Sequence, residues 1–239
     1  MTFLQIGQRL AMECGASITL STMNPVGQPQ EAQQFIAWVI DAWSDLQCDH
    51  DDWDWMRASN LLGSGVSFQT VNNTYSYPLG VGSGTVGVLE LNFGKWVRPT
   101  FRCNTTSVGH RDEIPLGEVS YDAWRDTYMR GAQRDVRTRP IIYAVGPDQS
   151  ICLGPPPNDD YTITGDYYTT PNPMINDSDT PPGLPLRFHM LIVYRGMLKY
   201  AGYESASEVY QRGKEEGDGM FAQLEAIRAP RVSFGRALA

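Results

Sequence analysis

Cysteine is scarce in this sequence, and its few cysteines have none of the spacings that hold a metal. The 239 residues include four cysteines, which lie far apart and form no CxxC pair: Cys14, Cys48, Cys103 and Cys152. The first fifteen residues carry an apolar stripe but not the basic segment and continuous apolar block of a secretory signal peptide. We therefore expect free thiols and a protein made in a reducing cytoplasm.

Long hydrophobic runs and an excess of positive charge are also missing. No stretch approaches eighteen apolar residues, so the sequence predicts no membrane span. The 27 acidic residues outnumber the 19 lysines and arginines, which gives a net charge of -8. A protein that grips nucleic acid normally has the opposite balance, because its cations neutralise phosphates. The charge is compatible with an acidic wall past which nucleic acid slides without binding.

The sequence has little that could serve catalysis. It has only three histidines: His50, His110 and His189. No GxSxG elbow is present, and the glycine-rich stretch 80–84 lacks the GK[ST] ending of a phosphate loop. Residues 48–52 (CDHDD) cluster possible metal ligands, but the second ligand pair of a closed zinc site is absent. We interpret that cluster as a solvated acidic helix end and expect no enzymatic activity, no cofactor and no metal.

What is present is an apolar pattern that changes twice along the chain. Helical spacing of apolar residues predicts helices near both ends, over residues 2–14, 29–48, 184–203 and 206–227. Between them, alternating segments such as 66–70, 86–91 and 141–145 predict strands, with one helix from about Ser120 to Gly131. The fold class expected is α+β: a helical bundle formed by both chain ends, with an inserted β-rich domain and an extended C-terminal arm.

These changes in pattern set the expected domain boundaries. Residues 1–57 and 171–228 should form the two parts of a helical body, residues 58–170 the β-rich insertion, and residues 229–239 the extended arm. The helix over 184–203 is apolar on almost every side, which is typical of a buried helix. We expect it to be the structural core of the helical body, with four buried side chains: Phe188, Leu191, Ile192 and Leu198. His189 lies in the same helix and should be a buried core residue.

Two blocks of opposite charge could form complementary faces. Residues 41–54 contain six aspartates and no cation, whereas residues 125–139 contain two aspartates and five arginines: Arg125, Arg130, Arg134, Arg137 and Arg139. A head-to-tail interface in a ring requires two different, complementary surfaces on each subunit. We therefore predict that the arginine block meets a neighbouring subunit or another component of an assembly. The alternative is that both blocks are solvated faces of a monomer.

An ordered set of short patches extends over nearly the whole chain. It comprises AMECG at 11–15, FIAWVIDAWSDLQ at 35–47, DWDWMR at 52–57, RPIIYA at 139–144, LGPPP at 153–157, YTITGDYY at 161–168, FHMLIVY at 188–194 and KYAGYE at 199–204. In this order the patches resemble head-to-tail adaptor proteins, also called connector or head-completion proteins, of short-tailed bacteriophages. The glycine-rich stretch 72–109 matches least well.

The resemblance implies a structural virion protein at the junction of capsid and tail, assembled in the host cytoplasm. Such adaptors form rings, typically of twelve subunits, below the portal protein. The ring extends the channel through which double-stranded DNA passes without sequence-specific binding, and it receives the tail nozzle or fibres. The resemblance implies no catalysis, cofactor or membrane partner.

The resemblance also gives a role to the C-terminal arm, because such adaptors commonly dock into the portal ring through a C-terminal extension. The segment from 228 onward has no acid and combines cations with apolar side chains: Arg228, Arg231, Val232, Phe234, Arg236 and Leu238. We expect these residues to order on the portal. The alternative is a disordered end without a function.

Two other kinds of protein remain open from the sequence. A tail protein that binds or hydrolyses carbohydrate would use aromatic side chains, such as Trp53, Trp55, Tyr167 and Tyr168, together with carboxylates such as Asp159 and Asp160. Another tail-completion protein near the portal would differ from an adaptor only in its position in the particle.

Overall fold

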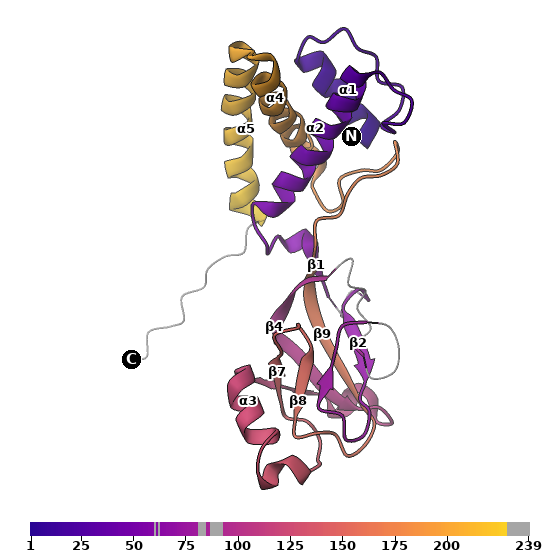
Figure 1. The fold of residues 1–239 in the computed structure, drawn as a ribbon, viewed down its shortest axis with the longest axis vertical. Coiled ribbons are helices and arrows are strands. Elements are labelled where there is room, and N and C mark those ends of the chain that lie inside the picture. Colours follow the sequence, from indigo (N-terminus) through magenta and orange to yellow (C-terminus); the bar gives the residue numbers. More distant parts are fainter. Residues whose placement is uncertain (60, 62, 81–84, 87–92, 229–239) are drawn as a thin grey trace, which may run out of the picture. The chain divides into compact units, whose positions relative to one another are not determined.

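The computed structural model describes residues 1–59, 61, 63–80, 85–86 and 93–228. The chain divides into two compact units. The helical unit comprises residues 1–56 and those from 171 onward, and the β unit comprises residues 57–170. The predicted α+β class, with helices from both chain ends packed together and strands inserted between them, is confirmed (Figure 1).

The helical unit contains four α-helices in its described residues. They are α1 (Phe3–Glu13), α2 (Gln30–Cys48), α4 (Met190–Glu204) and α5 (Ser207–Arg228), with 3-10 turns η1 (Asp54–Met56) and η6 (Leu186–Phe188). Thr2 caps the start of α1 with a capping box: its hydroxyl accepts from the backbone N–H of Gln5, and the Gln5 side-chain oxygen accepts from the backbone N–H of Thr2. Pro29 occupies the N-cap position of α2.

Helix α4 is the centre of this unit, because α1, α2 and α5 all pack against it (Figure 1). The approach is close at two glycines. A Cβ at Gly196 would lie 2.7 Å from the Leu10 side chain of α1, and one at Gly213 of α5 would lie 3.1 Å from the Tyr194 carbonyl. Glycine is unusual inside a polar helix such as α5. Here Gly213 allows the backbone of α5 to approach the backbone of α4.

The burial of α4 follows its apolar pattern. Phe188, Leu191 and Ile192 are each at most 1% exposed, whereas Leu198 is only partly buried. His189 is also buried, at 4% exposed, as expected from the sequence. Its Nδ1 lies 2.8 Å from the Met1 amino group and its Nε2 lies 3.0 Å from the Leu184 carbonyl, so both ring nitrogens have partners.

The β unit contains short strands around two longer ones. They are β1 (Arg57–Ala58), β2 (Val66–Gln69), β3 (Ser76–Tyr77), β4 (Phe93–Thr105), β5 (Ile114–Pro115), β6 (Gly117–Glu118), β7 (Ile142–Val145), β8 (Ile151–Gly154) and β9 (Tyr161–Thr169). It also holds helix α3 (Tyr121–Tyr128) and the 3-10 turns η4 (Gly109–Asp112) and η5 (Ala132–Asp135).

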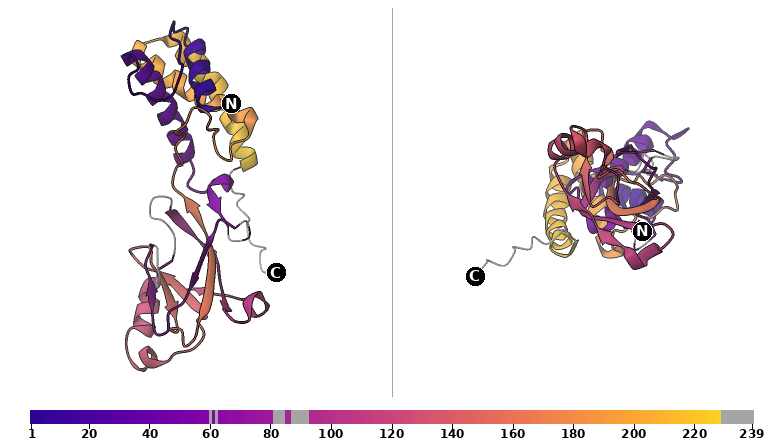
Figure 2. Two further views of the ribbon diagram at one scale, coloured as in Figure 1. Left: turned by 90° about the vertical axis from the view of Figure 1, so that its right-hand side faces the viewer. Right: turned by 90° about the horizontal axis from the view of Figure 1, so that it is seen from below.

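These strands form two sheets (Figure 2). The first has the order β1–β9–β4–β5, with β2 also paired to β9, and all of its pairings are antiparallel. The second has the order β3–β8–β7–β6, in which only the pairing of β6 with β7 is parallel among the described residues. Side chains of both sheets share one hydrophobic core, where the rings of Phe101 and Tyr143 lie 4.6 Å apart.

Helix α3 covers a separate small cluster of the second sheet. Its Trp124 is 3% exposed, and the indole Nε1 donates to the Leu153 carbonyl at 2.9 Å. Ser120 caps the helix through a bond from the Ala123 N–H, as expected, although the helix ends at Tyr128, three residues before Gly131.

The chain enters and leaves the β unit on neighbouring strands. Strand β1 is its first element and pairs with the end of β9, its last, so that Arg57 lies opposite Tyr168. The Arg57 Nη2 and the Asp166 carboxylate are 2.6 Å apart, and the Asp166 residue is 7% exposed. This charge-assisted bond fixes the first strand to the last at the point where the insertion begins and ends.

Two sequence expectations differ from the structure or fall outside it. Ser205, expected to begin the last helix, instead ends α4 in a left-handed conformation with φ of 56°, and α5 begins at Ser207. The expected strand 86–91 and the glycine-rich tip 80–84 lie mostly outside the described residues.

Candidate functional site

Three of the six aspartates in the acidic block 41–54 pair with cations of the helical unit. The Asp45 carboxylate lies 2.7 Å from the Lys199 Nζ of α4, Asp49 contacts Arg195 of α4, and the Asp54 carboxylate lies 2.7 Å from Arg228 of α5. The guanidinium of Arg195 also lies 4.9 Å from the ring of Phe221. Much of this block is therefore an internal seam between α2 and the two C-terminal helices, rather than a free acidic face.

The arginine block 125–139 separates into paired and unpaired members. Arg125 lies 3.1 Å from the Asp122 carboxylate, and Arg130 lies 3.6 Å from that of Asp126, as is common for residues one helical turn apart. Arg139 reaches into the β unit, where its guanidinium donates to the Cys103 carbonyl at 2.8 Å and to Asp112 at 3.1 Å. These three arginines are engaged within their own unit.

Asp112 is held as a carboxylate by the same network. The Thr105 hydroxyl donates to it at 2.6 Å, and this bond lowers the pKa of Asp112 below its ordinary value. The Arg139 charge lowers that pKa further. The network connects β4 to the segment that leads into β7, which is a structural role for Arg139 that the sequence pattern did not indicate.

Arg134 and Arg137 differ from the other three. Every residue from 131 to 138 is exposed, and in the described part of the chain neither of these two guanidinium groups has an ion pair. Val136, between them, is 40% exposed. We call residues 132–137 the arginine segment.

The possible metal ligands do not assemble into a site. Among the described residues, no group of three or more His, Cys, Asp or Glu side chains lies close enough to hold an ion. His50, the central residue of the CDHDD cluster, instead lies 2.7 Å from the Glu225 carboxylate and packs edge-on against Trp53 at 4.7 Å. All four cysteines are free, and burial raises the pKa of the Cys14 thiol to about 12.

The aromatic residues considered for sugar binding are mostly occupied by packing. Trp53 is fully buried and stacks on Trp55 at 4.3 Å between ring centroids. Tyr167 packs against Phe93 and Trp96 at the edge of the β-unit core. Such buried faces offer no open stacking platform to a sugar ring.

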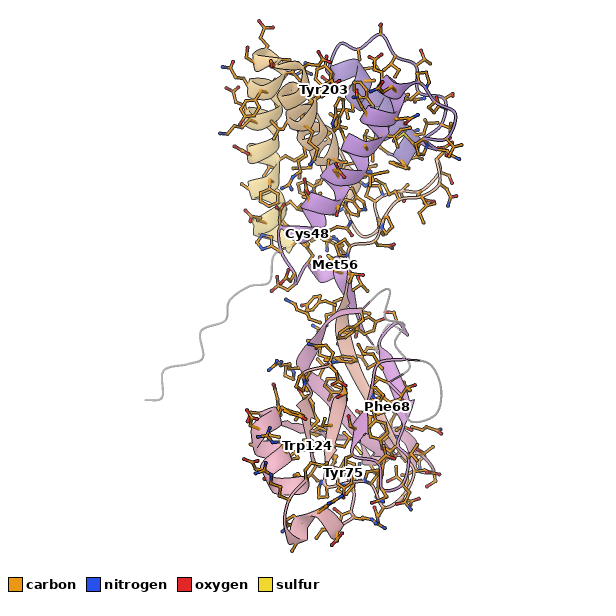
Figure 3. The ribbon with its side chains drawn as sticks, in the orientation of Figure 1. Cys48, Met56, Phe68, Tyr75, Trp124 and Tyr203 are labelled. Atoms are coloured by element: carbon orange, nitrogen blue, oxygen red, sulfur yellow. The ribbon has the colours of Figure 1, made fainter. Side chains whose placement is uncertain are left out.

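A different set of aromatic side chains is accessible, on the helical unit. A surface groove of about 610 Å³ lies between α2 and α4, beside the loop that follows α1. We call it the aromatic groove, and its principal lining residues are Glu31, Trp38, Tyr200, Tyr203 and Glu204. Figure 3 labels Tyr203 in this unit, and the residue is 59% exposed.

The groove was not predicted, although its signal is present in the sequence. Phe35 and Trp38 on α2 are three residues apart, as are Tyr200 and Tyr203 on α4, so each pair lies on one face of its helix. The sequence does not show that α2 packs on α4 with these faces adjacent. That juxtaposition comes from the packing of apolar residues elsewhere along the two helices.

Comparison with known families decides the class of protein. A family model described as SU10 adaptor protein matches residues 1–236, which is nearly the whole chain. The chain belongs to this family. The resemblance to phage head-to-tail adaptors is thus confirmed, and the protein is a phage adaptor and a structural protein. A search of curated proteins finds no match.

Family membership gives the adaptor a place among phage head and tail components. None of its described helices is both long and apolar enough to cross a membrane. Of the six arm residues, Arg231, Val232, Phe234, Arg236 and Leu238 lie outside the described residues. Arg228 is the last residue of α5, where it contacts Asp54.

Proposed function

We propose that this adaptor forms a ring of about twelve subunits that joins the portal to the tail and continues the DNA channel. The observation that carries the proposal is the match of the adaptor family to residues 1–236, which covers both units of the chain. An adaptor must bind one component of the head and one of the tail, and a ring on the portal axis provides a surface for each. The tail nozzle or the fibres are the partners on the tail side.

The charge distribution supports a channel through which DNA moves. The helical unit has sixteen acidic residues against nine basic ones, and the β unit has eleven against ten. Neither unit has the basic excess from which phosphate binding derives its affinity. Negative walls repel the phosphate backbone, so DNA passes without sequence-specific contacts and without being retained.

The ring is tested by the mass and symmetry of the purified full-length protein, alone and mixed with portal. Light scattering should give a mass near twelve subunits in at least one of these samples, and negative-stain images should show a closed ring. A protein that stays monomeric in both, although circular dichroism shows it folded, would contradict the ring. A stoichiometric 1:1 complex with a tail protein would favour the alternative of a tail-completion protein.

The C-terminal arm is proposed as the portal-docking element. Residues 229–239 follow α5 directly, and Pro230 prevents a simple continuation of that helix. The segment carries Arg231 and Arg236 but no acid, in a chain of net charge -8. Arg228 is best assigned to the base of the arm, because its contact with Asp54 joins the end of α5 to η1.

Deletion of the C-terminal arm tests whether portal binding can be lost without loss of the fold. Deleting residues 229–239 should leave a soluble, folded protein that no longer binds portal in a pull-down. A second variant, Phe234→Ala with Leu238→Ala in the full-length chain, keeps the charges, removes the apolar contacts and should also weaken portal binding. If the truncated protein binds portal as strongly as the wild type, the arm is not the docking element.

A further inference from the structure

The aromatic groove has the geometry of a receptor for a planar cation. The Trp38 ring is its centre, with the rings of Phe35, Tyr200 and Tyr203 at centroid distances of 5.0, 5.7 and 5.7 Å. Trp38 is only partly buried and Tyr203 is exposed, so rings remain open to the groove. A cation within about 6 Å of a ring centroid is attracted by the electrons of the ring face, and tryptophan attracts it most strongly.

Two carboxylates complete the groove. Glu31 lies in the first turn of α2 on one side and Glu204 is the last residue of α4 on the other, and in the described part of the chain neither has an ion pair. Both carboxylates line the groove together with Tyr200. Burial raises the pKa of Tyr200, and the charges of Cys14, Glu204 and Glu31 raise it further. The groove is therefore an aromatic surface with uncompensated negative charge.

The position of Glu204 is unfavourable for its own helix. The C-terminus of a helix carries partial negative charge, where a cation stabilises and an anion destabilises. The last turn of α4 has no basic residue, and its final residue is this glutamate. The carboxylate therefore gains no stabilisation from α4 and remains available to a cation from outside the helix.

We propose that the aromatic groove binds arginine side chains of the arginine segment, residues 132–137, of a second copy of this chain. The inference rests on the proposed ring and identifies its subunit contact. Arginine fits better than lysine, because its flat guanidinium stacks on a ring while its N–H groups donate to carboxylates at the edge. A groove on one unit and a cationic segment on the other are different surfaces, as a head-to-tail ring requires.

The charge and the exposure of the arginine segment support it as the ligand of the aromatic groove. Arg134 and Arg137 lie on a segment that is exposed throughout, and the three other arginines of the block are bound within their own unit. The exposed Val136 between them adds an apolar contact for the aromatic walls. Binding brings two cations to two carboxylates, which removes the uncompensated charge from both surfaces.

The test is a charge exchange between copies in the full-length protein. Two variants are made: Glu31→Arg with Glu204→Arg, which reverses the groove, and Arg134→Glu with Arg137→Glu, which reverses the segment. Each variant alone should need at least tenfold more protein to form rings, with or without portal, because every contact places like charges together. In an equimolar mixture each groove meets a segment of opposite charge, so rings should form again near the wild-type concentration.

Control variants reverse single exposed charges at positions away from the contact. Glu215 of α5 and Arg111 of η4 are exposed, and neither has an ion pair among the described residues. Glu215→Arg and Arg111→Glu should form rings as the wild type does. The aromatic contribution is tested by Tyr203→Ala, which should weaken assembly, against Tyr210→Ala, an exposed tyrosine of α5, which should not.

The outcomes separate this contact from the ring itself. Absence of rings in wild-type protein, alone and with portal, would remove the proposed function. Wild-type rings together with normal assembly of both charge-reversed variants would overturn the groove contact and leave the ring intact. Failure of each variant without recovery in the mixture would also overturn it, because the two surfaces would then not face each other.

Discussion

The two units of this adaptor use their charged residues in different ways. In the helical unit, cations from α4 and α5 reach across to aspartates that follow one another along residues 45–54. In the β unit, Arg125 and Arg130 pair with aspartates of α3, and Arg139 binds Asp112 and the Cys103 carbonyl of β4. These two units show that a run of like charges in a sequence does not by itself form a surface that is free to bind a partner. The ion pairs that each charged residue makes within its own unit decide whether it remains available for binding.

The core of the helical unit offers the largest effect with which to test this comparison. Leu191 is 1% exposed at the centre of α4, and replacing it by alanine removes buried methyl groups and leaves a cavity. Leu191→Ala should lower the free energy of unfolding by about 2–5 kcal/mol. Urea denaturation followed by circular dichroism measures it. Leu198→Ala, at a partly buried site of the same helix, should cost less; equal costs would place the core elsewhere.

The second test concerns the internal use of an arginine in the β unit. Arg139→Ala leaves the Cys103 carbonyl without its side-chain donor and Asp112 without its cation. The expected loss is about 1–3 kcal/mol, the cost of leaving a partly buried polar group unsatisfied. Arg137→Ala is the control, because that side chain is exposed, and its stability should match the wild type. If Arg139→Ala also matches the wild type, Arg139 would be free for an interface after all.

A third test uses pH to distinguish the units. Burial lowers the pKa of His189 in the helical unit below its ordinary value, so the folded state resists protonation there. The contribution of neutral His189 to the free energy of unfolding is complete above the ordinary histidine pKa, near 6.5. It is lost as the pH falls from that value toward the lower pKa of His189 in the folded protein. Urea denaturation at pH 7 and pH 5 should show this loss. His189→Gln should have a smaller pH dependence, and His110→Gln, at an exposed site, should behave as the wild type.

The smallest effect is expected at the acidic seam. Asp54 and Arg228 form a partly exposed pair, and such pairs contribute about 0–1 kcal/mol. Asp54→Asn should therefore change the free energy of unfolding by no more than this, and less at high salt. Thermal denaturation at two salt concentrations measures both. A loss of several kcal/mol would mean that the seam is a buried network, and the contrast between the units would then need revision.

The sequence predicted the helical unit well because its signals are local. The amphipathic spacing of α1 and α2 and the apolar composition of α4 each give a helix and its buried face without knowledge of the partner. Leu198 was predicted to be buried but is only partly buried. The apolar residues of α4 lie on all its sides, so the sequence does not show which side the neighbouring helices leave uncovered. Ser205 is a good capping residue by type, but here it ends one helix instead of beginning the next.

The β unit was predicted less completely, and strand β4 shows why. Its thirteen residues include Gly94 and Pro99, and its register against β9 shifts twice, between Phe93 and Lys95 and between Val97 and Arg102. Each irregularity breaks the alternation of buried and exposed residues on which strand prediction depends. The aromatic groove escaped prediction for another reason, because it depends on the packing of α2 against α4, which neither helix specifies alone.

The pairing of β1 with the end of β9 makes the insertion a replaceable module. Residues that face each other across an antiparallel pair have their Cα atoms about 4.5–5.5 Å apart, so the β unit departs from the chain and returns to it at almost the same point. The helical bundle therefore needs only to bridge that short gap, whatever lies beyond it. A hairpin of two residues between Ala58 and Tyr167 would span the same distance. The β unit can thus be lengthened, shortened or exchanged without moving the two points at which it joins the helical unit.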